Sequence, residues 1–189
     1  LAAEHWSCWG FGLRRLRLSG IKASCARVLV GGRGRLFWCV LMLPHSVLDT
    51  TGLPVREATA AWQESVGVMF DTRLRRAPEN GFRAEVEGFQ FGELLLGNCR
   101  TVAQTFDRSP RRISRDNLDH VLLQFYTEGS CGRCDGGLDE RTRPGDLWIS
   151  DLAQPQAAAA TDFRNLNLVV PRRLLAPLLN APNEHNMRV

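Results

Sequence analysis

One stretch of the 189-residue sequence decides the fold: Asp119-His120-Val121-Leu122-Leu123-Gln124-Phe125-Tyr126-Thr127-Glu128-Gly129. It predicts a β-strand from Leu118 to Thr127, because successive side chains of a strand point to opposite faces of a sheet. Val121, Leu123 and Phe125 then share one face. The other face carries Leu122, Gln124 and Tyr126.

Shorter runs of the same kind lie on both sides of this strand, with Gly or Asn at their borders. The further predicted strands are Phe82 to Val86, Phe89 to Leu96, Thr101 to Phe106, Leu147 to Ser150 and Phe163 to Val170. In the last strand Leu166, Leu168 and Val170 alternate with Asn165 and Asn167, which again indicates two faces.

Turn residues separate these strands. Tight turns are predicted at Pro78-Glu79-Asn80-Gly81 and at Pro144-Gly145-Asp146, and Gly129 to Gly137 is interpreted as a hairpin loop. Ala157 to Ala160 is interpreted as a small linker run.

Helices are expected at both ends of the strand region. Pro54 suits a first helical position, because the backbone N–H that proline lacks would have no partner there. An apolar stripe follows at helical spacing and predicts an amphipathic helix to about Phe70. The stripe consists of Val55, Ala58, Trp62, Val66 and Met69. At the other end, Pro171 opens a short helical turn with Leu174 and Leu175.

Length and composition fit one mainly β (α+β) domain, built as an antiparallel sandwich or barrel. Hydrophobic residues make up 44% and charged residues 23%, which excludes bulk disorder. The longest apolar run, Leu36 to Leu43, has eight residues, whereas a membrane-spanning helix needs about 20. Six cysteines are too few for a disulfide-dense scaffold. We therefore expect a cytoplasmic protein with no membrane partner.

Positive charge is concentrated in residues 1–45. This segment has seven Lys and Arg residues against Glu4 alone, a net charge of +6, so the remainder carries −2 of the formal +4. A nucleic-acid or membrane-binding tail, a signal peptide and a glycine-rich cofactor loop are alternatives. Because no sustained period is present, we interpret residues 1–45 as a disordered or non-native segment, with Met42 as the first natural residue.

Residues that could carry chemistry are scattered. Cys131 and Cys134 form a Cys-x-x-Cys pair, but a structural zinc needs about four ligands, so we interpret them as small residues in an exposed loop. Asp116, Asp119 and His120 could form an acid–base group, although a turn before the strand explains Asp116 more simply. We expect no catalytic residue, no metal and no cofactor.

Four arginines surround Pro110, namely Arg108, Arg111, Arg112 and Arg115. Such a cluster could contact phosphate. Asp107 and Asp116 flank it, which favours a solvated loop.

Three residues are candidates for binding a ligand. Gln124, Tyr126 and Trp148 carry polar or aromatic groups within strongly apolar strands. A closed or nearly closed antiparallel barrel of this size encloses side chains or one small ligand. The three residues could line such a cavity; the alternative, in which they face solvent or another layer, stays open because strand faces cannot be assigned from sequence.

Several features in a fixed order resemble one family. They are the helix ending near Phe70, the stretch Asp119 to Gly129, the turn Arg143-Pro144-Gly145-Asp146-Leu147-Trp148-Ile149-Ser150-Asp151, and Phe163 to Leu175. Over about residues 53–180 the chain resembles the N-terminal sensing domain of AraC/XylS-type transcriptional regulators. The resemblance implies a cupin-like β-barrel that binds an effector, often with a dimer contact, joined to a C-terminal pair of DNA-binding helix-turn-helix motifs.

Under this resemblance, residues 53–180 form the ligand-binding domain and residues 181–189 begin a linker. Gly129, Pro144, Gly145 and Asp146 become structural turn residues. Too few residues follow Leu179 for a helix-turn-helix, so DNA contact is expected only through a C-terminal region outside these 189 residues. The expected partners are an unknown small-molecule effector and a second copy of the chain. The alternative is a free-standing cupin-like binding protein or enzyme, weakened because the His and Glu cluster of metal-dependent cupin enzymes is missing.

Overall fold

The strand predicted around Gln124 is β6 (His120–Glu128), and it lies in a six-stranded sheet. The computed structural model describes residues 43–75, 81–137 and 140–189. Residues 1–42, and with them nearly all of the basic segment, lie outside the described residues. The turn expected at Pro78-Glu79-Asn80-Gly81 also lies outside them, except for Gly81.

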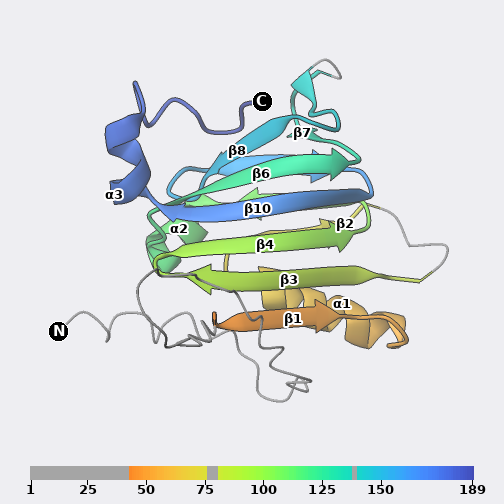
Figure 1. Ribbon diagram of the computed structural model, residues 1–189. Coiled ribbons are helices and arrows are strands. Elements are labelled where there is room, and N and C mark those ends of the chain that lie inside the picture. The colour runs from red at the N-terminus through yellow and green to blue at the C-terminus, as the bar shows by residue number, and fades with distance from the viewer. Residues whose placement is uncertain (1–42, 76–80, 138–139) are drawn as a thin grey trace, which may run out of the picture.

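The six-stranded sheet has the order β1-β3-β4-β10-β6-β8, and all neighbours are antiparallel (Figure 1). Its other strands are β1 (His45–Asp49), β3 (Ala84–Phe91), β4 (Leu94–Thr101), β8 (Leu147–Asp151) and β10 (Phe163–Pro171). The predicted alternation holds here: on β10, Asn165 is buried, whereas Leu166 on the other face is exposed.

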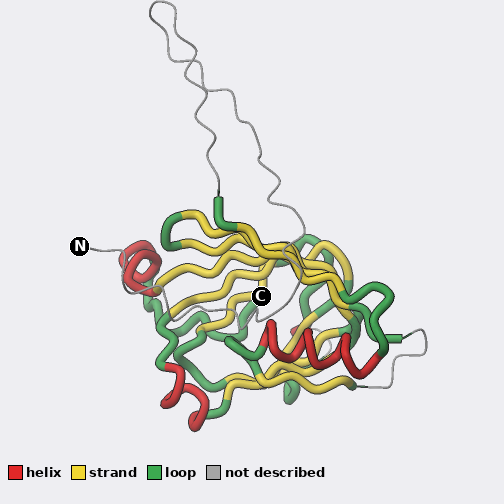
Figure 2. Tube along the Cα trace, turned by 90° about the horizontal axis from the view of Figure 1, so that it is seen from below, coloured by secondary structure: helices red, strands yellow, loops and turns green. Residues whose placement is uncertain are grey.

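A second, four-stranded antiparallel sheet has the order β2-β5-β9-β7. Its strands are β2 (Asp71–Leu74), β5 (Gln104–Arg108), β7 (Cys131–Arg133) and β9 (Gln156–Ala160). Figure 2 shows the two sheets as separate layers, and the side chains between them form the core. The expected antiparallel, mainly β sandwich is confirmed.

The helices are also close to expectation. The amphipathic helix is α1 (Val55–Val66), with Pro54 just before its first turn and with Ala58, Trp62 and Val66 buried. It ends before Phe70, because the chain turns at Gly67, whose N–H still bonds to the Gln63 carbonyl. A short α2 (Pro110–Asp116) precedes β6, and the C-terminal turn is α3 (Arg172–Leu175) followed by a 3₁₀ turn, η3 (Ala176–Leu178).

Three of the predicted strands, Phe82 to Val86, Phe89 to Leu96 and Thr101 to Phe106, have the wrong bounds. The break expected near Gly88 lies instead at Gly92, where a positive φ of 59° allows the β3–β4 hairpin to turn. Gly88 is in mid-strand, paired with Gly97 of β4. Residues 101–106 contain the end of β4 and the start of β5 instead of one strand.

The linker interpretation of Ala157 to Ala160 is also wrong. These residues belong to β9, which pairs with β5 and β7, and Ala158, Ala159 and Ala160 are buried. Side chains this small let the strand pack closely against the core. The hairpin-loop interpretation of Gly129 to Gly137 is wrong for Cys131–Arg133, which form β7 and pair with β9. The sequence patterns did not predict β1, β2 or β7, since each strand is short and has little apolar alternation.

Candidate functional site

The helix α1 lies on the same side of the six-stranded sheet as the smaller sheet (Figures 1 and 2). A buried hydrogen bond holds it there: the Trp62 Nε1 donates to Gln104 Oε1 at 2.8 Å. Gln104 begins β5 and is fully buried, and its own Nε2 bonds to Thr101 Oγ1 and to the Val102 carbonyl. The indole of α1 is therefore fixed to the junction between the two sheets.

A cavity of about 290 Å³ lies between α1 and the inner face of the six-stranded sheet. Two glycines help to create it, since Gly88 of β3 and Gly97 of β4 are register partners and both line it. A Cβ on Gly88 would come 3.1 Å from Ser46 Oγ, within the same space. The walls are mostly apolar and include Trp62, Val66, Phe70, Phe106, Leu122 and Phe163.

Three side-chain amides form a hydrogen-bonded chain along one wall of the cavity. Gln124 Nε2 donates to Asn167 Oδ1 at 3.1 Å, and Asn167 Nδ2 donates to Asn165 Oδ1 at 2.9 Å. The chain follows from strand register, because Gln124 of β6 pairs with Asn167 of β10. We call Gln124, Asn167 and Asn165 the amide chain.

The two ends of the amide chain differ in their access to the cavity. Asn165 is fully buried and lines the cavity, and its Nδ2 makes no hydrogen bond within the described part of the chain. The Nδ2 is inaccessible from the cavity and lies beside the Tyr126 hydroxyl, with which the Asn165 side chain interacts. The other end of the amide chain, Gln124, is only half-buried and lines the cavity.

The cavity wall is nearly uncharged. Among the described residues that line it, the ionisable side chains are Glu64, which is exposed on α1, and Cys99. Burial raises the pKa of the Cys99 thiol to about 12, so Cys99 is neutral at pH 7.

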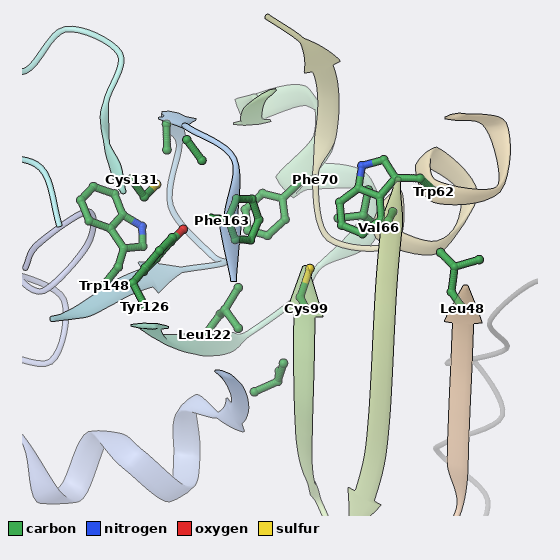
Figure 3. Close-up of a cluster of buried hydrophobic side chains, with 14 of the residues drawn as sticks. Leu48, Trp62, Val66, Phe70, Cys99, Leu122, Tyr126, Cys131, Trp148 and Phe163 are labelled. Atoms are coloured by element: carbon green, nitrogen blue, oxygen red, sulfur yellow. The ribbon is translucent and has the colours of Figure 1, made fainter. Parts of the chain in front are cut away.

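Of the predicted ligand residues, Gln124 lines the cavity, whereas Tyr126 and Trp148 do not. All three share the inner face of the sheet, since Trp148 is the register partner of Gln124. Figure 3 shows Tyr126, Trp148 and Cys131 grouped at one end of the core and Trp62 and Val66 at the other. Burial raises the pKa of Tyr126 well above its usual value, and Trp148 Nε1 bonds to Ser150 Oγ at 3.1 Å.

The predicted turn residues lie together beside β6. The Asp146 carboxylate accepts a hydrogen bond from the Arg143 N–H at 2.7 Å. Gly145 has a φ of 101°, and its N–H donates to the Tyr126 carbonyl. Gly129 has a φ of 74°, and a Cβ there would overlap with the Asp162 carbonyl oxygen.

The solvated-loop interpretation of the arginine cluster is wrong for Arg108. Its side chain is fully buried and donates two hydrogen bonds to Asp116, at 2.9 and 3.0 Å, and one to the Met69 carbonyl. Arg111 and Arg115 are exposed. Asp116 is therefore engaged with Arg108, and Asp119 pairs with Arg172.

The exposed-loop interpretation of the Cys-x-x-Cys pair is wrong for Cys131, which is buried in the core, and right for Cys134. Both are free thiols, and burial raises the pKa of each. Over residues 43–75, 81–137 and 140–189, no three His, Cys, Asp or Glu side chains are grouped to hold a metal ion. No helix within the same ranges is long and apolar enough to cross a membrane.

Five residues that line the cavity were not among the predicted ligand residues: Trp62, Gly88, Gly97, Asn165 and Asn167. A signal was present for the asparagines, because two amides at alternate positions of an apolar strand share one face. No local signal separates a cavity-forming glycine from a turn glycine.

Two antiparallel sheets packed face to face, with a cavity under α1, form a cupin-like β-sandwich. The model of the AraC-binding-like domain family matches residues 62–189. The chain belongs to this family, as the sequence resemblance predicts.

Two known proteins are similar to the chain. The transcriptional activator NphR of Rhodococcus sp is 29% identical over 154 residues, which make up 81% of this chain and 39% of NphR. The crystal structure of the AraC-like transcriptional activator CuxR has 24% identity and a TM-score of 0.66, covering 76% of this chain and 53% of CuxR. The chain thus spans about two fifths of the curated relative, and CuxR supports the fold.

Proposed function

We propose that this domain binds a small-molecule effector in the cavity under α1 and acts as the sensing part of an AraC-type transcriptional regulator. The observation that carries the proposal is a mostly apolar cavity of about 290 Å³ under α1 with the hydrogen-bonded amide chain along one wall. Membership of the AraC-binding-like family and similarity to the activator NphR support a regulatory role. Contact with DNA would belong to a separate domain.

We also propose that the cavity binds its ligand without converting it. A general acid or base must titrate near the working pH. Cys99 has a pKa of about 12, and Glu64 is exposed on α1, away from the buried end. Neither group suits proton transfer to a ligand held at the amide chain.

The structure offers one route by which cavity occupancy could reach the C-terminal end. Gln124 lies on β6, which pairs with β8. On β8, the Ile149 N–H donates to the Arg188 carbonyl at 3.0 Å, and the Met187 N–H donates to the Ile149 carbonyl at 2.8 Å. The C-terminal residues thus continue the sheet that carries the amide chain, and a ligand that shifts β6 would shift them.

The expected pairing with a second copy stays a prediction. Its main support is the outer face of the six-stranded sheet, where Leu96, Phe125 and Leu166 are 48%, 41% and 47% exposed. Sedimentation equilibrium of the chain and of Leu166→Glu tests it. A dimer that the substitution splits supports the prediction, and a monomer in both samples contradicts it.

The sensing proposal is tested by thermal unfolding of the full 189-residue chain with a panel of small molecules. A ligand at 100 times its Kd adds about 2.7 kcal/mol of stability, which raises the Tm of a domain this size by roughly 5–10 °C. Gly88→Leu fills the cavity and should abolish the rise.

Gly137→Leu is the matched control, because a Cβ there meets nothing within 4 Å and the residue does not line the cavity. It should keep the ligand-induced rise. If no molecule stabilises the wild-type chain, or if Gly88→Leu responds like wild type, the cavity is not the effector site.

A further inference from the structure

We propose that the cavity selects an uncharged, ring-sized molecule that carries a hydroxyl group, held at the Gln124 end of the amide chain. This inference rests on the proposed sensing function and adds the chemical class of the effector. It follows from the hydrogen-bonding capacity, the charge and the size of the cavity.

The amide chain presents a free acceptor to the cavity. Its internal hydrogen bonds run in one direction, from Gln124 to Asn167 to Asn165. They leave the Gln124 Oε1 as an acceptor at the cavity wall, while the Asn165 Nδ2 is inaccessible from the cavity and lies beside the Tyr126 hydroxyl. A ligand hydroxyl can donate to the Gln124 Oε1, whereas a purely apolar ligand would cover that acceptor and leave it unpaired.

Charge excludes anionic ligands. No Arg, Lys or His lies among the described residues that line the cavity. Arg108, a buried cation on the neighbouring sheet, is already bonded to Asp116 and to the Met69 carbonyl. A carboxylate or phosphate would lose its hydration without gaining a counter-charge, which is strongly unfavourable.

Size and wall chemistry favour a flat ring system. An apolar cavity of about 150 Å³ holds benzene, and this cavity is about 290 Å³. Three phenylalanines form edge contacts along the wall, with ring centroids 5.6 Å apart for Phe70 and Phe106 and 6.0 Å apart for Phe106 and Phe163. Aromatic ligands pack well against such edges and faces.

The proposal is tested by calorimetric titration of the full chain at pH 7 with three matched probes: 2-naphthol, naphthalene and 2-naphthoate. They share the ring system and differ in carrying a neutral hydroxyl, no polar group or a carboxylate. We expect 2-naphthol to bind about tenfold more tightly than naphthalene, equivalent to about 1.4 kcal/mol. We expect 2-naphthoate to bind most weakly.

Gln124→Leu removes the acceptor and should erase the preference for 2-naphthol over naphthalene. Naphthalene binding serves as the internal test of folding, since a variant that still binds it retains the cavity. Asn165→Leu removes the oxygen to which Asn167 donates, which loosens the chain that orients Gln124, and should reduce the preference. Asn98→Leu makes the same change on the outer face of β4, opposite Leu166, and should leave all three affinities unchanged.

The two proposals fail in different ways. Equal affinity for 2-naphthol and naphthalene, or tightest binding of 2-naphthoate, overturns the ligand class and leaves the effector cavity intact. The proposed ligand class is also wrong if none of the three probes binds while the thermal panel finds another ligand whose stabilising effect is lost in Gly88→Leu. If no probe binds and the panel is empty, both proposals are wrong.

Discussion

Replacing Trp62 by Phe tests how α1 is held over the cavity. The substitution removes the indole N–H that donates to Gln104 Oε1 at 2.8 Å, and both residues are buried. Leaving a buried acceptor unpaired costs about 1–3 kcal/mol, and the smaller ring leaves a void that costs about 1 kcal/mol more. We therefore expect the free energy of unfolding to fall by about 2–4 kcal/mol.

Urea unfolding followed by far-ultraviolet circular dichroism measures this loss, with an unchanged m value showing that only stability has changed. Adding Gln104→Leu removes the unpaired acceptor as well. The double variant should then lose less than the sum of the two single variants, by about 0.5–3 kcal/mol. Additivity of the two losses would show that the hydrogen bond contributes nothing.

Trp148→Phe is the matched control, because its indole N–H bonds to Ser150 within the same strand at the other end of the core. Both variants lose global stability, but only Trp62→Phe should speed hydrogen exchange of the α1 amides through local opening. The reasoning is wrong if Trp62→Phe stays within about 0.5 kcal/mol of wild type, or if α1 exchanges equally in both variants.

Three further predictions concern the scaffold. Arg108→Met leaves the Asp116 carboxylate without its buried partner and should lower the free energy of unfolding by about 3–5 kcal/mol in urea, whereas the exposed Arg111→Met should change it by under about 0.5 kcal/mol. In calorimetry, Gly129→Ala should lower the Tm more than Gly145→Ala, because both have positive φ but only at Gly129 would the Cβ overlap with a carbonyl oxygen. The Cys99 pKa of about 12 lies above that of a thiol in the unfolded chain, about 8.5. The contribution of the neutral Cys99 thiol to the free energy of unfolding is therefore fully present below about pH 8.5 and is lost as the pH rises towards 12. The urea midpoint should fall less steeply above about pH 9 in Cys99→Val than in wild type.

Much of the larger sheet could be predicted, because its alternation is local. Gln124 and Asn167 each lie in an apolar strand, and the side chains next to them in the sequence point to the other face of the sheet. That they bond to each other depends on the pairing of β6 with β10, which lies beyond any local pattern. Periodicity alone left a sandwich or a barrel, and the family resemblance implied a cupin-like β-barrel; the structure has two sheets packed as a sandwich.

The position of the cavity could not be predicted, for a physical reason. Tyr126 and Trp148 share the inner face with Gln124, but the smaller sheet covers their part of it, whereas α1 covers the other part and leaves space. Which half of a face is filled depends on tertiary packing. Arg108 shows the same limit, since its burial depends on Asp116 and on the distant Met69 carbonyl.

Nuclear magnetic resonance of the ¹⁵N-labelled chain titrated with 2-naphthol tests the central claim most directly. If the cavity under α1 is the effector site, the Trp62 indole signal and the side-chain amide signals of Asn165, Asn167 and Gln124 should shift together and saturate. The Trp148 indole, at the other end of the core, should move much less. Saturable binding that leaves the Trp62 indole and the three amides unmoved would contradict the account.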